Sequence, residues 1–105
     1  MISTNQPQFM KHDSGKCMVS LVDPAFTLGV GAILTFGAHK YAINNWQLVP
    51  DITRYKDAAY RHFLAYLSGE LIDPESGLPH LDHLATNIMF LRYFEHGDGV
   101  LPKEQ

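Results

Sequence analysis

The sequence predicts a small all-α domain of two to three main helices with a short extended N-terminal arm. Apolar residues recur three and four positions apart in three segments, which is the period of an amphipathic helix. Proline, aspartate and glycine stand where these segments begin and end. The length of 105 residues fits one domain, and a hydrophobic content of 46% is typical of a globular protein.

The first predicted helix covers residues 24–41. It begins at Asp23-Pro24, because aspartate can cap a helix and proline fits its first position. Its apolar stripe is formed by Val30, Ile33, Leu34 and Tyr41. Glycines inside a helix each cost up to about 1 kcal/mol relative to alanine. The three glycines of this segment therefore favour close approach by another helix or a ligand.

The second predicted helix begins at a cap formed by Asp51 or Thr53 and reaches residue 68, where Gly69 ends it. The third covers residues 80–95 and stops at Gly97. The apolar stripes are formed by Tyr55, Ala59, Phe63 and Tyr66 in the second helix and by Leu84, Ile88 and Leu91 in the third.

Residues 13–97 are predicted to form a single domain, preceded by a flexible N-terminus at 1–12 and followed by a C-terminal tail at 98–105. Within the domain, residues 17–22 are expected to be extended. Three helices of this length do not easily cover one another, and the glycine-rich first helix would let two backbones approach closely. We therefore expect a homo-oligomer.

Composition excludes several classes of function. The net charge is −3 and the cations are scattered, which argues against a nucleic-acid duplex as partner but leaves a small phosphorylated ligand possible. Cys17 is the only cysteine, so a disulfide within the chain and a thiolate zinc site are excluded. No apolar run is long enough to cross a bilayer, and the first residues lack a secretory pattern. We expect a cytoplasmic protein without a membrane partner.

Two segments carry candidate nucleotide-binding residues. Lys16 follows a glycine in a turn before the first helix, where the backbone can approach a phosphate and lysine supplies charge. The second segment contains Lys40, Tyr41, Asn45 and Trp46. Aromatic rings stack on bases and amides read their edges. The alternatives are an ordinary surface turn at Lys16 and a buried aromatic anchor at the end of the first helix.

The candidate metal ligands lie on the last two helices and the loop between them. They are His62, Glu70, Asp73, His80 and His83, and Asn87 shares a helix face with the last two. Imidazole suits zinc, manganese or iron, and carboxylates suit magnesium or manganese. We expect a mixed divalent site, with Mg²⁺ or Mn²⁺ favoured over Zn²⁺.

The chain must reverse between residues 69 and 79, so we expect the loop carboxylates beside His80 and His83, facing Arg61 or His62. The structural alternative is that the histidines cap and pack, the carboxylates bond to the loop, and Arg61 pairs with Asp57.

An ordered series of short motifs covers most of the chain. It comprises Asp13-Ser14-Gly15-Lys16, Ser20-Leu21-Val22, Phe36-Gly37-Ala38-His39-Lys40-Tyr41, Asn45-Trp46, Arg61-His62, Gly69-Glu70, Asp73-Pro74-Glu75-Ser76-Gly77-Leu78-Pro79-His80, His83 and Asn87. In order and spacing, this series resembles a phage protein family, the N-terminal domain of dATP/dGTP diphosphohydrolase.

The resemblance implies hydrolysis of dATP or dGTP to the monophosphate and pyrophosphate in the host cytoplasm. That activity belongs to the all-α MazG-like pyrophosphatases, which hold magnesium with an EExxE motif on one helix and ExxD on the next. Glu70-x-x-Asp73 resembles the second motif, and the second predicted helix offers only Asp57 for the first.

The implied roles divide the candidates into two groups. Glu70, Asp73 and Arg61 would be catalytic, and the nucleotide would be bound by Lys16, Lys40, Tyr41, Asn45, Trp46 and Asn87. A second hypothesis is a non-catalytic, anti-defence sponge that sequesters a bacterial signalling nucleotide with the same residues and needs no metal. A third is a structural helical module that binds no ligand.

Overall fold

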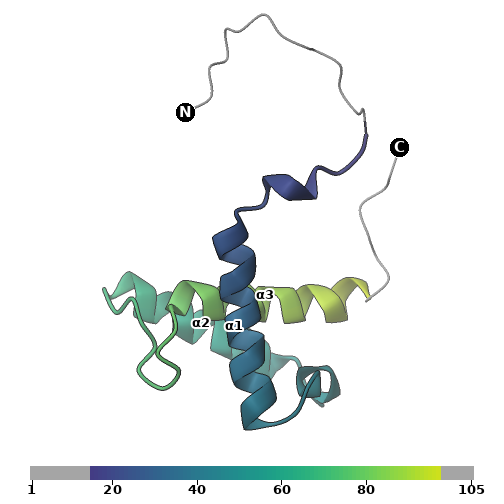
Figure 1. The fold of residues 1–105 in the computed structure, drawn as a ribbon. Helices are drawn as coiled ribbons and strands as arrows, with labels where there is room; N and C mark the ends of the chain where they lie inside the picture. The colour runs from purple at the N-terminus through teal and green to yellow at the C-terminus, as the bar shows by residue number, and fades with distance from the viewer. Residues whose placement is uncertain (1–14, 98–105) are drawn as a thin grey trace, which may run out of the picture.

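The structure, a computed structural model, describes residues 15–97 and is all-helical over that range, as predicted (Figure 1). The principal helices are α1 (Pro24–Lys40), α2 (Thr53–Leu67) and α3 (His80–His96), and two 3-10 turns are η1 (Val19–Leu21) and η2 (Asn45–Leu48). Each principal helix matches its predicted span closely. The predicted flexible N-terminus and C-terminal tail lie outside the described residues.

The segment at residues 17–22, which we expected to be extended, contains a turn. The N–H of Leu21 donates to the carbonyl of Met18 at 3.0 Å, and that of Val22 donates to Val19 at 3.1 Å. No strand lies beside this segment in the described part of the chain, so local bonds satisfy the backbone instead. The prediction of extended backbone is therefore wrong at η1.

Local sequence explains most of the helix boundaries. Pro24 occupies the start of α1 as predicted, although the Asp23 side chain makes no capping bond. Before α2, the Asp51 carboxylate accepts the N–H of Thr53 at 2.9 Å, which satisfies one of the unpaired donors at that end. Gly69 follows α2 with φ of 100°, a backbone conformation that glycine adopts without a steric penalty.

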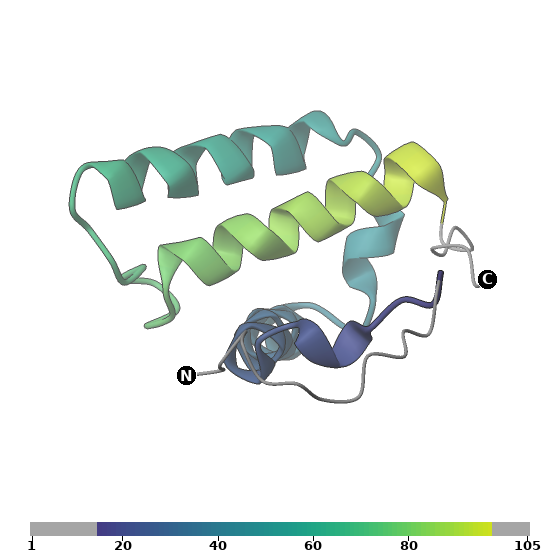
Figure 2. The ribbon, with the colours of Figure 1, turned by 90° about the horizontal axis from the view of Figure 1, so that it is seen from above.

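Helix α3 is the centre of the fold. α2 and α3 lie side by side and antiparallel, joined by the loop at residues 68–79, and α1 crosses α3 at a steep angle (Figures 1 and 2). Both outer helices therefore contact α3. The connection that contains η2 returns the chain from the end of α1 to the start of α2 (Figure 2).

The interior of the described chain is unusually polar. Ile33 is its one buried apolar residue, whereas the buried residues of α3 are His80, His83, Thr86 and Asn87. Two of these side chains bond within their own helix: the Thr86 hydroxyl donates to the carbonyl of Asp82 at 2.8 Å, and the Asn87 amide donates to that of His83 at 2.9 Å. Helix α3 thus presents a polar face where a core helix ordinarily presents aliphatic side chains.

Aromatic packing holds together the end of the α2–α3 pair that lies far from the loop at residues 68–79. Trp46 stacks on Phe90 with ring centroids 4.6 Å apart and meets Tyr93 edge-on at 4.9 Å. Tyr55 donates its hydroxyl to the carbonyl of Trp46 at 2.7 Å and packs against Phe90 at 4.7 Å. These contacts hold η2 against both α2 and α3.

Helix α1 leaves much apolar surface exposed. Its sequence carries no charged residue from Pro24 to Ala38, and Phe26 and Leu28 are exposed. Within the described residues, none of the helices is both long enough and apolar enough to traverse a bilayer.

Gly29 of α1 faces the side chain of Asp82 where α1 crosses α3. A methyl group at this position would lie 2.4 Å from Oδ2 of Asp82, whereas nothing lies within 4 Å of one at Gly31. The backbone of α1 therefore approaches a side chain of α3 at Gly29, whereas Gly31 and Gly37 are open, so the close approach expected from the three glycines occurs at one of them.

Alanine substitutions should separate these two glycines. Gly31→Ala should raise the free energy of unfolding by up to about 1 kcal/mol through helix propensity. Gly29→Ala should lack that gain because the Asp82 carboxylate has to move. Denaturant unfolding measures both, and an Asp82→Ala background should restore the gain to Gly29→Ala. Equal effects of the two alanine variants would contradict the close approach.

Candidate metal centre and adjoining cavity

The loop between α2 and α3 is folded around Asp73. Its carboxylate accepts the backbone N–H of Ser76 at 3.0 Å and the Ser76 hydroxyl at 2.9 Å. The Asp73 N–H donates to the carbonyl of Leu78 at 2.8 Å, and the His80 N–H donates to that of Leu71 at 2.9 Å. These bonds close the loop into a defined shape beside the N-terminal turn of α3.

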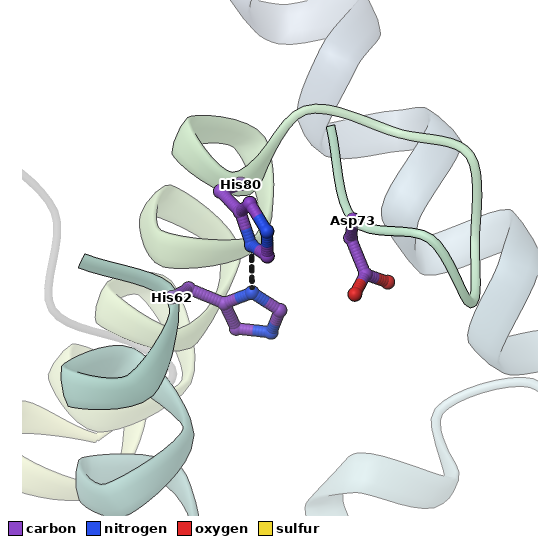
Figure 3. Close-up of side chains that lie close together, drawn as sticks. All are labelled: His62, Asp73 and His80. Carbon is purple, nitrogen blue, oxygen red and sulfur yellow. Dashed lines mark hydrogen bonds between the residues drawn. The ribbon is translucent and has the colours of Figure 1, made fainter. Parts of the chain in front are cut away.

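Three histidines from two helices meet beneath this loop. His62 of α2 and His80 of α3 contact each other through their Nδ1 atoms at 2.8 Å (Figure 3). His83 of α3 stacks on His62 with ring centroids 4.3 Å apart and an interplanar angle of 4°. The predicted meeting of the loop with α2 therefore occurs at His62.

The two histidines at the start of α3, His80 and His83, are each bonded to the loop through the Nε2 atom. His80 contacts Oε1 of Glu70 at 2.7 Å. His83 contacts the hydroxyl of Ser76 at 2.6 Å and lies 3.5 Å from Oδ2 of Asp73. The sequence placed these carboxylates beside the histidines. It missed Ser76, although Ser76 stands within the Asp73–His80 motif.

A possible metal-binding group lies within this cluster. His62, Asp73 and His80 each offer a ligand atom, and these atoms all lie within 4.8 Å of one another (Figure 3). Of the other two candidate ligands, Glu70 bonds to His80 and His83 bonds to the loop. All five predicted ligands therefore lie in one cluster. Three of them offer grouped ligand atoms, and the other two, Glu70 and His83, are bonded to neighbouring side chains.

The charge states of these groups suit a cation. Burial lowers the pKa of His62 from 6.5 to about 4, with smaller contributions from His83 and His80. Burial also lowers the pKa of His83, opposed by the charge of Asp73. Burial raises the pKa of Asp73, but the hydrogen bonds from Ser76 and the charges of His83 and His62 together outweigh burial, so the net pKa is lowered. At neutral pH, His62 and His83 carry lone pairs and Asp73 is ionised.

A large cavity adjoins the cluster. It has a volume of about 1010 Å³ and lies between the C-terminal half of α1, the connection at residues 41–50, the start of α2 and the middle of α3. His83 is part of its wall. Because His83 also stacks on His62, the cavity ends where the candidate metal centre begins.

The structure brings most of the predicted nucleotide-binding residues together. The cavity wall includes Lys40, Tyr41, Asn45, Trp46 and Asn87. The wall does not include Lys16, which is exposed before η1, or Arg61, which is exposed on α2 beside His62. Arg54 at the start of α2 is a cavity cation that sequence reasoning missed, because only the fold carries the start of α2 to this wall.

Several of these cavity residues already have partners. Lys40 forms an ion pair with Glu75 of the loop, Nζ to Oε2, at 2.6 Å. Trp46 packs against the rings of Phe90, Tyr93 and Phe94, so this residue is an aromatic anchor for η2, although it is half-buried and not buried. The Asn87 amide is bonded to its own helix. Tyr41 and Asn45 are exposed at the cavity.

Acidification of the metal-free protein should lower its stability through His62. The folded pKa of about 4 lies below the ordinary 6.5, so the unfolded chain binds more protons than the folded one between these values. The contribution is fully present above pH 6.5 and is lost as the pH falls toward 4.

Thermal melts from pH 7 to pH 4 should therefore show a falling melting temperature. His62→Gln should reduce the dependence of melting temperature on pH to the smaller contribution made by His83. His39→Gln, on the exposed end of α1, should leave that dependence unchanged. An unchanged slope in His62→Gln would show that this imidazole is not buried in the folded protein.

Comparisons with known proteins agree with this picture at the level of family. The family model described as dATP/dGTP diphosphohydrolase, N-terminal, matches residues 6–100. A protein of Salmonella phage PMBT28, named dATP/dGTP diphosphohydrolase, is 42% identical over 82 residues, which is 78% of this chain. The matched region spans only 28% of that relative's length. No solved structure matches. The chain belongs to the family of dATP/dGTP diphosphohydrolase N-terminal domains.

Proposed function

We propose that the chain binds a purine deoxynucleoside triphosphate and acts as a metal-dependent diphosphohydrolase, releasing the monophosphate and pyrophosphate. The observation that carries this proposal is the position of His83, which lines the cavity and stacks on His62 of the candidate metal centre. A nucleotide in the cavity would have its phosphates next to a divalent ion. The name of the phage relative, dATP/dGTP diphosphohydrolase, supports dATP or dGTP as the substrate.

The cavity offers groups for both ends of such a ligand. Tyr41 supplies an aromatic face and Asn45 an amide, which suit a purine ring. Lys40 and Arg54 supply positive charge for the phosphates. Because Lys40 is paired with Glu75, an anionic ligand would displace that carboxylate. The Lys40 ammonium lies 5.4 Å from the centroid of Tyr41, so base and phosphate groups would be held by adjacent residues.

Hydrolysis to these products requires a water oxygen to attack the α-phosphorus while the bond to the oxygen bridging to the β-phosphorus breaks. A bound divalent ion would neutralise phosphate charge and activate the water. Its candidate ligands are His62, His80 and Asp73. Arg61, whose charge is felt at His62, would stabilise the negative charge that develops on the leaving oxygen.

A second candidate function is nucleotide binding without hydrolysis. Asp73 supplies the one carboxylate of the grouped ligands, and Asp57 is the one acidic residue of α2, so the carboxylate-rich pattern implied by the resemblance is incomplete. The chain also spans only 28% of the phage relative. Such a protein would sequester a nucleotide, including a bacterial defence signal, in the host cytoplasm.

Incubation with a panel of dNTPs and either Mg²⁺ or Mn²⁺ should separate these functions. We expect dATP and dGTP to yield dAMP or dGMP and pyrophosphate, detected by ion-exchange chromatography. Recovery of intact nucleotide from the heated protein would instead favour sequestration. A protein that neither binds nor converts any nucleotide would exclude both functions and leave the structural module.

Carboxylate variants provide the matched control for turnover. Asp73→Asn should reduce the rate by about 10–100-fold or more, since losses of that size follow even from changes around a metal site. Asp57→Asn makes the same chemical change on the exposed surface of α2 and should leave the rate unaltered. Full activity in Asp73→Asn would place the site elsewhere.

We also propose that the chain is a homo-oligomer. The described part of the chain buries one apolar residue and exposes many others, including Phe26 and Leu28 of α1. Covering such surface with a second copy would remove apolar area from water. Sedimentation velocity at micromolar concentration should show a species larger than the monomer, and a monomer alone would refute the proposal.

A further inference from the structure

The donor atoms of the candidate metal centre indicate a particular class of ion. His62 and His80 offer imidazole nitrogens, and Asp73 offers a carboxylate oxygen (Figure 3). Imidazole suits divalent transition ions such as Mn²⁺, Fe²⁺, Co²⁺ and Zn²⁺, whereas Mg²⁺ takes oxygen ligands and keeps much of its water. A donor set with nitrogen in the majority therefore disfavours Mg²⁺.

Glu70 fixes which nitrogen of His80 can bind an ion. His80 is only 4% exposed, and its Nε2 lies 2.7 Å from Oε1 of Glu70. A carboxylate can only accept, so Nε2 carries the hydrogen and Nδ1 keeps its lone pair. That lone pair is directed at His62. A histidine held by a carboxylate through its other nitrogen is the usual support for a metal ligand.

The two Nδ1 atoms of His62 and His80 can share either one hydrogen or one metal ion between them. They are 2.8 Å apart, so without a cation the hydrogen on Nδ1 of His62 donates to the lone pair of His80. When an ion binds, that hydrogen moves to Nε2 of His62, and both lone pairs face the ion. Ligand distances of about 2.1 Å allow donors up to about 4.2 Å apart. The group lies within 4.8 Å, so small side-chain rotations suffice.

His83 touches the ligand set, but its Nε2 atom is occupied by a hydrogen bond to Ser76. The single hydroxyl hydrogen of Ser76 goes to Asp73 at 2.9 Å, so at the 2.6 Å contact the Nε2 of His83 donates to Ser76. Its ring lies flat against His62. His83 therefore orients two ligands, His62 by stacking and Asp73 through Ser76.

We propose that His62, His80 and Asp73 form a binding site for a divalent transition-metal ion, with Glu70 and His83 as positioning residues. This inference rests on the divalent site of the proposed function. It replaces the expected preference for Mg²⁺ or Mn²⁺ over Zn²⁺ with a preference for transition ions, Mn²⁺ and Zn²⁺ included, over Mg²⁺. It concerns metal binding alone, so it can be tested without a nucleotide.

The test uses the full chain, stripped with chelator and titrated with Co²⁺. Visible absorption bands should grow to one equivalent per chain, and Zn²⁺ should abolish them whereas a large excess of Mg²⁺ should not. Displacement by Mg²⁺ comparable to that by Zn²⁺, or no binding of Co²⁺, would overturn the inference. Nucleotide hydrolysis is measured separately, so metal binding without turnover would refute only the catalytic function.

Ligand variants locate the site. His80→Gln and Asp73→Asn should lose the Co²⁺ bands, whereas His96→Gln, at the exposed end of α3, should keep them. Circular dichroism checks the folding of both variants, and because asparagine keeps a side-chain oxygen that can accept the Ser76 hydrogen bonds, Asp73→Asn remains informative if His80→Gln unfolds. Wild-type bands in a folded Asp73→Asn protein would exclude this ligand set.

Positioning variants give a graded result. Glu70→Ala should weaken Co²⁺ binding by about 10–100-fold without moving the bands, and Glu70→Gln should recover part of the loss because its amide oxygen still accepts from His80. His83→Gln should keep the band positions. Loss of a nitrogen ligand from the Co²⁺ spectrum of His83→Gln, or unchanged affinity in Glu70→Ala, would contradict the assigned roles.

Discussion

The pairing of two buried histidines with the loop at residues 68–79 is the constraint on which the rest of this structure depends. His80 and His83 lie in the interior of α3, where an unpaired polar group is costly. Glu70 and Ser76 supply their partners. The same contacts give the loop its shape and bring Asp73 to His62. Removal of a partner would therefore disturb the fold and the candidate site together.

This arrangement exchanges apolar burial for organised polar contacts. A central helix that buries His80, His83, Thr86 and Asn87 gains less from the hydrophobic effect than an aliphatic one. In return its side chains are held by defined bonds, which rigidify a site when every member is satisfied. No side-chain polar atom that is buried in the described residues lacks a partner. Because the interior is polar, apolar side chains of α1 such as Phe26 and Leu28 remain exposed.

The cavity and the metal centre depend on different parts of the fold. The metal centre is built by α2, α3 and their loop, which are neighbours in sequence. The cavity requires α1 to cross α3 with its C-terminal half beside η2, and Gly29 of α1 leaves space for the Asp82 side chain of α3. His83 and the Lys40–Glu75 pair connect the cavity to the loop and the metal centre. We therefore expect a ligand in the cavity to change the affinity of the metal centre for its ion, and the reverse.

The sequence by itself determined the three helices and the grouping of the loop carboxylates with the histidines. Helical periodicity, Pro24 and Gly69 are local signals, and a short reversal leaves little choice in where Glu70 and Asp73 lie. Only the tertiary structure decided which donors converge, that Trp46 is stacked on a neighbouring ring, and that the wall of the cavity excludes Lys16 and Arg61. These outcomes follow from how whole helices rotate and cross. Contacts between residues far apart in sequence set that geometry, and the local sequence pattern does not encode it.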